Sequence, residues 1–206
     1  MEGLFITFEG LDGCGKTTQI KLLKDYLEEQ GRKVVLTREP GGTKISEDIR
    51  DIILDVKNKE MSYNCEMLLY AAARAQLVKE VIKPSLMQGA VVLCDRFVDS
   101  SYVYQGIARG LGIEKVDKIN QIAMDDVIPD ITLFFDITPQ ISLQRRMKVS
   151  MADRIEEEKL EFHQKVYEGY KYLASRYSDR IKTIDANCEI EDVRRQVLEK
   201  VVNTSL

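Results

Sequence analysis

Short apolar runs alternate with longer amphipathic stretches along the whole chain. One run opens at Leu4, and four more follow at Lys33–Thr37, Ala90–Cys94, Ile131–Ile137 and Arg180–Ile184. Apolar residues at helical spacing predict helices at Thr17–Gln30, Ser46–Val56, Tyr63–Met87, Ile113–Val127, Ile141–Met147, Glu156–Tyr177 and Ile190–Val202. Short strands that alternate with helices predict an α/β fold, in which helices cover both faces of a parallel sheet.

Polar residues gather where the predicted strands end. The second strand runs into Arg38-Glu39-Pro40-Gly41-Gly42-Thr43, and the third runs into Asp95-Arg96. Ligands of parallel sheets bind beyond the carboxyl ends of the strands, so these residues are candidates for a binding site. A plain turn and a capping aspartate are the structural alternatives.

The stretch from Gly10 to Thr17 fits G-x-x-x-x-G-K-[ST], the P-loop, and lies between the first predicted strand and the first predicted helix. Its glycines let backbone N–H groups point at an anion, and the helix N-terminus adds positive potential. Lys16 has the reach to contact β- and γ-phosphates, and the Thr17 hydroxyl is suited to Mg²⁺. This motif predicts binding of a nucleoside triphosphate; a glycine-rich turn is the alternative.

The third predicted strand ends in a pattern that resembles a Walker B motif, in which Asp95 would hold Mg²⁺ or orient phosphates. ATP-driven motors usually place a Glu next to activate water, but here Arg96 follows. A guanidinium favours the binding of a second phosphate over the hydrolysis of ATP.

Two further stretches have the composition of a small-molecule pocket. Tyr70 and Arg74 lie at i and i+4 on one helix face, where an aromatic ring can stack on a base and an arginine can bond its edge. The stretch 100–106 is rich in hydroxyl and amide groups, as such pockets require. For Tyr70 and Arg74, packing in the core is the alternative.

A basic stretch runs from Arg145 to Arg154 after a predicted helix. It is either a solvated loop or a mobile lid that brings cations over the phosphates. Arg50, in the second predicted helix, is by itself a solvated charge.

Composition limits the class of protein. The chain has 206 residues, 44% of them hydrophobic, with a net charge of −4 and a pI near 5.3. We expect one domain over 1–206, with no nucleic-acid partner and no membrane partner. The sequence has no signal peptide and no C-x-x-C pair among its four cysteines, which favours the cytoplasm.

Three stretches together resemble the signatures of the thymidylate kinase family, and the resemblance extends from Phe5 to about Val197. The first two are 8–13 and Thr37-Arg38-Glu39-Pro40-Gly41-Gly42. The third is Asp95-Arg96-Phe97 with Ser100-Ser101 and Tyr104-Gln105-Gly106. Asp153-Arg154-Ile155-Glu156 is similar to the family's lid.

This resemblance implies a P-loop kinase three-layer sandwich, with a five-stranded parallel sheet and a short lid at about 145–156. It also implies transfer of the ATP γ-phosphoryl group to dTMP with Mg²⁺, cytoplasmic dTTP synthesis, and a homodimer joined through helices that include Tyr63–Met87.

The resemblance also assigns roles to individual residues. In the thymidine pocket, Tyr70 would stack on thymine, Arg74 would bond its exocyclic oxygen, Ser101 and Gln105 would line the base, and Tyr104 would lie by the sugar. Asp12 would lie near the 3′-hydroxyl, and Arg38, Arg50 and Arg96 near the acceptor phosphate. ATP would contact Gly10, Leu11, Asp12, Gly13, Cys14, Gly15, Lys16, Thr17, Thr18 and Arg146, with Mg²⁺ on Thr17 and Asp95. The catalytic set would be Lys16, Asp95, Arg96 and Arg154.

The chain departs from the family pattern at several positions. Gly13 stands where some members carry Arg, so the second phosphate-binding cation should come from the lid, with Arg154 the first candidate and Arg146 the second. Cys14 stands where Ala or Ser is usual. It is either a reactive thiol, with its pKa lowered by Lys16 and the helix N-terminus, or an inert small residue.

Two other classes of function are considered. The first is a P-loop kinase of another small nucleotide or nucleoside, which Tyr70, Arg74, Ser101 and Gln105 disfavour. The second is a GTPase switch or a regulatory ATP-binding module; the guanine-reading N-K-x-D motif of a switch is absent from the sequence.

Overall fold

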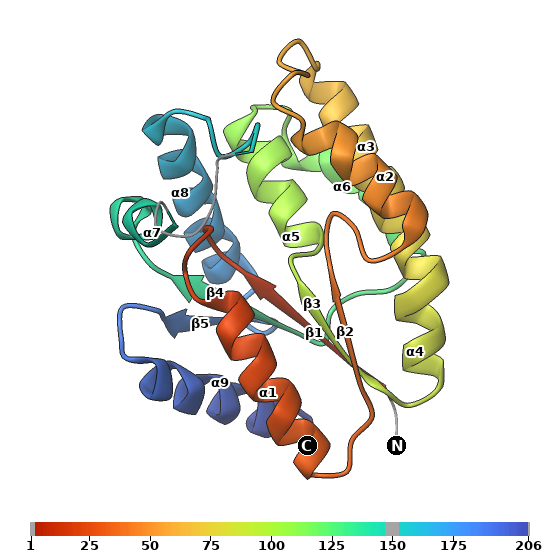
Figure 1. The fold of residues 1–206 in the computed structure, drawn as a ribbon, viewed down its shortest axis with the longest axis vertical. Coiled ribbons are helices and arrows are strands. Elements are labelled where there is room, and N and C mark those ends of the chain that lie inside the picture. The colour runs from red at the N-terminus through yellow and green to blue at the C-terminus, as the bar shows by residue number, and fades with distance from the viewer. Residues whose placement is uncertain (1–2, 147–152, 206) are drawn as a thin grey trace.

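The computed structural model describes residues 3–146 and 153–205, which form a five-stranded parallel sheet with helices on both faces (Figure 1). The strands are β1 (Leu4–Glu9), β2 (Val34–Arg38), β3 (Val91–Asp95), β4 (Ile131–Asp136) and β5 (Ile181–Asp185), in the order β2-β3-β1-β4-β5. The α-helices are α1 (Lys16–Glu29), α2 (Lys44–Leu54), α3 (Tyr63–Leu77), α4 (Lys83–Met87), α5 (Val98–Ser101), α6 (Ile113–Met124), α7 (Pro139–Arg146), α8 (Leu160–Arg176) and α9 (Ile190–Ser205). Two π-helical segments are η1 (Val78–Ile82) and η2 (Tyr102–Ala108).

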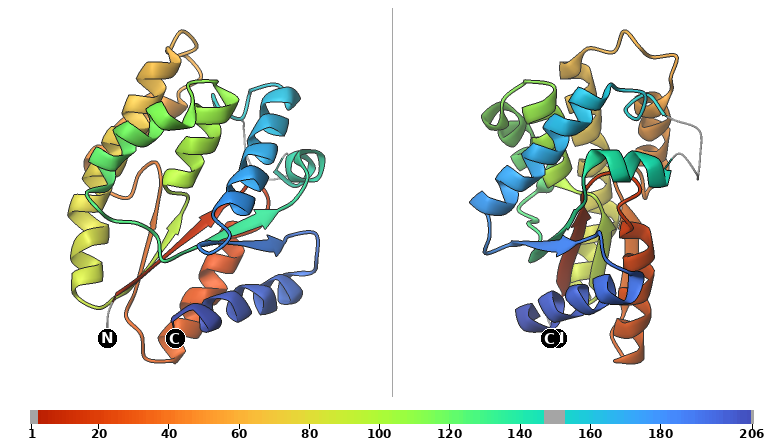
Figure 2. Two further views of the ribbon diagram at one scale, coloured as in Figure 1. Left: turned by 180° about the vertical axis from the view of Figure 1, so that it is seen from behind. Right: turned by 90° about the vertical axis from the view of Figure 1, so that its left-hand side faces the viewer.

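The central strand β1 explains why the sheet is buried on both sides. Leu4, Ile6 and Phe8 belong to the core cluster under α1 and α9, whereas Phe5 belongs to the cluster under α3, η2 and α8. Because side chains alternate across a strand, an apolar residue at nearly every position buries both faces. Figure 2 shows the resulting layers from two further sides. The predicted parallel sheet, flanked by helices, is confirmed.

Local signals set the starts of the two helices that follow the second strand along the chain. The Thr43 hydroxyl accepts a hydrogen bond from the Ser46 N–H at 3.2 Å and caps α2, and the Ser62 hydroxyl accepts one from Cys65 N–H at 3.3 Å and caps α3. A capping hydroxyl satisfies one of the N–H groups that a helix leaves without a partner at its first turn.

Two predicted helices differ from the structure, and one helical segment was not predicted. The helix predicted at Tyr63–Met87 contains the π-helical segment η1. The helix predicted from Glu156 begins at Leu160 instead, because residues 154–157 form turns. No helix was predicted at 98–108, where α5 and η2 lie. The predicted helix end at Met147 and the lid centre 147–152 lie outside the described residues.

No helix among 3–146 and 153–205 combines the length and the apolar character that crossing a bilayer requires.

Candidate active site

The P-loop connects β1 to α1 and ends in a left-handed turn. Gly15, just before the helix, has φ of 97°, a conformation that glycine adopts without steric cost. Lys16 is 5% exposed, and its ammonium donates to the carbonyl oxygens of Gly10 at 3.2 Å and Leu11 at 3.1 Å. The loop carbonyls therefore hold this cation at the mouth of the loop, where phosphate oxygens can replace them.

A hollow of about 540 Å³ lies over the P-loop. Its lining comes from the loop, the end of β3, the end of α7 and the lid, namely Asp12, Gly13, Gly15, Lys16, Thr17, Thr18, Asp95, Arg145, Arg146 and Glu156. We call it the P-loop cavity. Its residues supply the backbone N–H groups, the lysine and the arginines that polyphosphate binding needs.

Thr17 and Asp95 meet inside the P-loop cavity. The Thr17 hydroxyl donates to Asp95 Oδ2 at 3.4 Å. One hydroxyl and one carboxylate are a suitable donor set for Mg²⁺, which is usually held by one or two protein oxygens together with substrate phosphates and water. Consistent with this, the described residues contain no cluster of three or more His, Cys, Asp or Glu that would form an all-protein metal site. The predicted pair therefore fits the ion.

A second hollow of about 130 Å³ adjoins the first and shares Asp12 and Glu156 with it. We call it the acceptor cavity. Of the residues predicted for dTMP, it brings together Asp12, Arg50, Tyr70, Arg96, Ser101, Tyr104 and Gln105. These residues come from the P-loop, α2, α3, the turn after β3, and the continuous segment of α5 and η2, so the fold assembles the set from parts that are distant in the sequence.

Arg96 lines the acceptor cavity and bonds Asp12, which both cavities share. It has φ of 68°, which places a non-glycine residue in the left-handed region, where backbone strain often marks a functional site. Its guanidinium donates to Asp12 at 2.8 Å and to the Tyr170 hydroxyl at 3.1 Å, and it lies over the Tyr104 ring. Desolvation opposes the charged form of Asp12, but Arg96 and Lys16 hold the pKa of this carboxyl well below its usual range. Asp12 is therefore an anion between the cavities.

Arg74 does not line the acceptor cavity; it lies behind it, 1% exposed. Its guanidinium donates to Glu39 at 2.9 Å and to Ser101 at 3.1 Å, and it also bonds Asn120. Burial raises the pKa of Glu39 to about 7, while Arg74 acts in the opposite direction. Arg74 therefore holds Glu39 and Ser101, two residues of the cavity wall. Its side chain does not line the cavity in which a thymine oxygen was expected to contact it.

Of the two arginines Arg50 and Arg38, only Arg50 lines the acceptor cavity. Arg50 lines the acceptor cavity and donates to the Pro40 carbonyl at 3.0 Å. Arg38 is not in the lining, because it pairs with Glu47 at 2.8 Å on the protein surface. Burial lowers the pKa of Arg50, and the neighbouring Arg38 adds to this effect. An anion in the cavity would offset that unfavourable charge.

The preference for Arg154 over Arg146 as the lid cation disagrees with the structure. Arg154 does not line the P-loop cavity; it donates to the Ile53 carbonyl at 2.7 Å and to Glu66 at 2.7 Å. Arg146 lines the P-loop cavity and pairs with Glu156. The buried carboxylate of Glu66 attracts Arg154 into the interior. No pattern in the sequence indicated that Glu66 is its partner.

The reactive-thiol hypothesis for Cys14 is wrong. Cys14 is 2% exposed and packs in the core cluster under α1 and α9. Burial raises the pKa of its thiol, and Lys16 only partly opposes this effect. A thiol needs exposure and a lowered pKa to react at neutral pH, so Cys14 is the inert small residue of the alternative.

Two buried carboxylates at the site were missed by the sequence analysis. Glu9, at the end of β1, accepts from the Phe97 N–H at 2.8 Å and from the hydroxyls of Ser100 and Tyr170. Glu66 accepts from Gln105 at 3.0 Å, so the wall of the acceptor cavity and the Arg154 segment share one carboxylate. A charged residue in a mostly apolar strand was the signal in the sequence that could have indicated a functional role for Glu9. No such signal marked Glu66.

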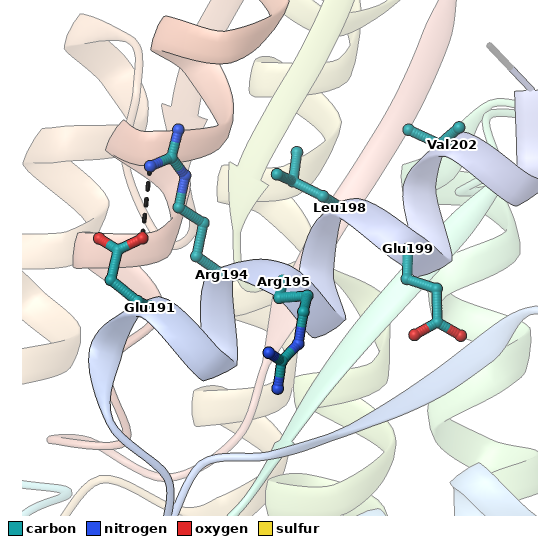
Figure 3. Close-up of a pocket in the computed structure, with 6 residues that line it drawn as sticks. All are labelled: Glu191, Arg194, Arg195, Leu198, Glu199 and Val202. Carbon is teal, nitrogen blue, oxygen red and sulfur yellow. Dashed lines mark hydrogen bonds and ion pairs between the residues drawn. The ribbon is translucent and has the colours of Figure 1, made fainter.

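A third hollow, along α9, differs from the two cavities because a single helix lines it. It is lined by Glu191, Arg194, Arg195, Leu198, Glu199 and Val202, all on one helix (Figure 3). Arg194 pairs with Glu191 at 3.4 Å, and the surface is open. It lacks the convergent polar groups of a binding site.

Comparison with known proteins agrees with this geometry. A family model described as thymidylate kinase matches residues 8–197. A thymidylate kinase of Thermoanaerobacter sp. (strain X514) is 54% identical over 201 residues, covering 98% of each chain, and one of Geobacillus sp. (strain WCH70) is 50% identical over 205 residues, again covering 98% of each. The crystal structure of thymidylate kinase from Ehrlichia chaffeensis superposes with a TM-score of 0.80 at 35% identity, covering 100% of both chains.

Proposed function

The chain belongs to the thymidylate kinase family and transfers the γ-phosphoryl group of ATP to dTMP, a step of dTTP synthesis, and we propose that its two adjoining cavities hold these two nucleotides. ATP occupies the P-loop cavity and dTMP the acceptor cavity. The observation that carries this assignment is that the two cavities share Asp12 and Glu156, so a donor and an acceptor would meet at that boundary.

On the donor side, backbone N–H groups of 10–18 and the Lys16 ammonium bind the phosphates, and Lys16 exchanges its loop carbonyls for phosphate oxygens. Thr17 and Asp95 hold Mg²⁺, which when bound neutralises charge on the phosphates. The 3.4 Å separation of their oxygens supports the pair.

On the acceptor side, the Tyr70 ring stacks on thymine, and Ser101 and Gln105 line the base. Tyr104 packs by the sugar, and Asp12 orients the 3′-hydroxyl. Arg74 is a positioning residue that fixes Ser101 and Glu39, a role its three hydrogen-bonded partners support. This differs from a direct bond to the thymine oxygen.

The acceptor phosphate binds to Arg96 and Arg50, with Arg38 nearby at the surface. Arg96 lines the acceptor cavity, and its guanidinium lies over the Tyr104 ring, 5.3 Å from the ring centroid, which fixes its direction. An acceptor phosphate oxygen attacks the γ-phosphorus, the bond to the bridging oxygen breaks, and ADP leaves with that electron pair.

Arg146 supplies the cation that stabilises charge on the transferring phosphoryl group. Two features support it: its place in the P-loop cavity beside Glu156, with which it pairs, and the glycine at position 13. Preorganised cations of this kind act mainly in the transition state.

Three further expectations complete the proposal: a single domain over 1–206, a cytoplasmic location, and a homodimer joined through helices that include Tyr63–Met87. To these helices we add α6, which packs against α3. Support for the dimer comes from exposed apolar residues on these helices, since Leu68 is 51% and Ile122 is 79% exposed.

The test of the dTMP assignment is calorimetric binding of dTMP to Tyr70→Ala and Ser101→Ala, with Tyr172→Ala as the control at a 50% exposed position on α8. Loss of a stacking ring should weaken dTMP binding by about 1–3 kcal/mol, without change in the control. An unchanged dissociation constant in both site variants would contradict the assignment.

A further inference from the structure

The single histidine of the chain has a ring nitrogen without a partner. His163 lies in the first turn of α8 and is 8% exposed. Its Nε2 atom is buried and has no hydrogen-bond partner among 3–146 and 153–205. A buried polar atom of this kind costs free energy, which calls for an explanation.

The ring faces a small hollow beside the active site. The hollow has a volume of about 10 Å³ and is lined by His163 with Asp12 of the P-loop, Ser142 and Arg146 of α7, and Glu156. Asp12, Arg146 and Glu156 also line the P-loop cavity, so this hollow lies next to the reaction.

His163 is neutral at pH 7. Burial lowers the pKa of the imidazole, against opposing effects from Asp12 and from backbone groups of Glu156 and Glu158. Its place at a helix N-terminus also disfavours a positive charge. The backbone carbonyls stabilise an N–H on the ring, and since Nε2 has no partner, we assign that hydrogen to Nδ1. Nε2 then carries a lone pair and is an acceptor.

Only a donor can serve that lone pair. The carboxylates of Asp12 and Glu156 are acceptors, and the Ser142 hydroxyl already donates to the Asp12 carbonyl. Arg146 carries five N–H donors and is the lining side chain whose chemistry matches.

We propose that His163 is a positioning residue for phosphoryl transfer, whose Nε2 accepts a hydrogen bond from Arg146 when this guanidinium leaves Glu156 for the γ-phosphate. The inference rests on the assignment of Arg146 above. A carboxylate neutralises the arginine and competes with phosphate for it, whereas a neutral imidazole orients the guanidinium and leaves its charge for the transition state. His163 thus gives Arg146 an uncharged partner during phosphoryl transfer.

Two substitutions separate the two ring nitrogens. The amide of His163→Asn lies where Nδ1 was, and the amide of His163→Gln reaches the place of Nε2. We expect kcat of His163→Asn to fall about tenfold with KM for dTMP unchanged, because this variant loses one hydrogen bond to a charged group. His163→Gln should recover most of that loss.

Lys165→Ala, at an exposed position on the same helix, is the control. A wild-type kcat in His163→Asn would overturn the inference, as would losses in both variants that follow their melting temperatures.

A double-mutant cycle with Arg146→Ala separates this inference from the assignment on which it rests. If His163 acts through Arg146, His163→Asn has no further effect in the Arg146→Ala background. If Arg146→Ala lowers kcat and His163→Asn lowers it again by the same factor, the inference is wrong and the assignment of Arg146 stands. If Arg146→Ala keeps wild-type kcat, both are wrong.

Because the chain has one histidine, its ¹⁵N imidazole signals are free of overlap in a tag-free sample. We expect the free enzyme to show the Nδ1–H tautomer. The Nε2 signal should shift when dTMP and a non-hydrolysable ATP analogue bind to the wild type, and remain in place in Arg146→Ala. An Nε2–H tautomer in the free enzyme, or an equal shift in both proteins, would overturn the inference.

Discussion

At the scale of single residues, the account depends on which arginine stabilises the transferring phosphoryl group. Arg146→Ala should lower kcat and kcat/KM together, by roughly 10³, the lower end of the effect of arginine fingers in related chemistry. Single-turnover transfer from ATP to dTMP measures this directly. If the variant keeps the wild-type single-turnover rate and only KM for ATP rises, Arg146 is a binding clamp.

Arg154→Ala should lower the stability of the protein and leave kcat almost unchanged. Arg154 bonds Glu66, which is fully buried, so its removal leaves one partner fewer on that carboxylate. We expect unfolding free energy to fall by about 1–3 kcal/mol, measured by urea denaturation, with kcat changed little. A loss of kcat as large as that of Arg146→Ala would show that Arg154 reaches the phosphates during turnover.

The pKa of His163 makes a prediction about stability in acid. Because burial lowers the pKa of the folded state, the unfolded chain binds a proton first as pH falls below its ordinary value of about 6.5. Folding stability is therefore lost on acidification from there down to the folded pKa, with a slope of at most about 1.4 kcal/mol per pH unit. Urea denaturation at several pH values should show a shallower slope in His163→Gln; identical slopes would contradict the lowered pKa.

Residue chemistry that is local in the sequence could be predicted, and chemistry that depends on distant partners could not. Lys16 and Thr17 lie in the P-loop as expected, because this motif fixes its own geometry. Asp95 reaches Thr17 because β1 and β3 are parallel neighbours, whose ends the strand pattern had already placed at one edge of the sheet. The positions of Arg74 and Arg154 depend on Glu39 and Glu66, which are distant in the sequence, and the pKa of Cys14 depends on burial.

At the scale of elements, the packing of α7 on the P-loop brings Arg146 to the site, and Gly13 permits it. A Cβ at Gly13 would lie 2.8 Å from the Ser142 carbonyl oxygen and 3.1 Å from the Arg146 nitrogen. A side chain here would push α7 away. In the sequence, Gly13 indicates that the P-loop lacks a second cation; in the structure, this glycine also makes room for α7, which carries Arg146.

Gly13→Ala should therefore lose activity beyond its loss of stability. Gly31→Ala is a matched control, because Gly31 has a similar φ of 76° against 83° but nothing within 4 Å of its Cβ position. Both variants should lose about 1–2 kcal/mol of unfolding free energy from the left-handed conformation. Only Gly13→Ala should also lose kcat. Equal kcat in the two variants would show that α7 does not depend on this contact.

The elements that the sequence predicted well are those with clear periodicity. The missed segment 98–108 has Asp, Ser, Gly and β-branched or aromatic residues, which favour helices weakly. It is helical because Tyr104 and Val103 pack into the core beneath α3 and α8, and tertiary packing overrides weak propensity. The Tyr104 and Gln105 positions were thus identified before their secondary structure.

At the scale of the whole molecule, the carboxyl edge of the sheet serves both nucleotides, while α3 and α6 carry an exposed apolar surface. If that surface joins two copies, Ile122→Asp should convert a dimer into monomers in sedimentation velocity, because a charge would be buried without a partner. Ile52→Asp, at a 50% exposed site on α2, is the control. A wild-type chain that sediments as a monomer at micromolar concentration would contradict the proposed dimer.

The most direct test of the account is the acceptor preference of the purified wild-type chain. ADP release from ATP should be measured in a coupled assay against dTMP, dUMP, dCMP, dGMP and dAMP, and without acceptor. The account predicts the highest kcat/KM with dTMP and ADP release that depends on an acceptor. A higher kcat/KM with another nucleotide, or equal ADP release without any acceptor, would contradict it.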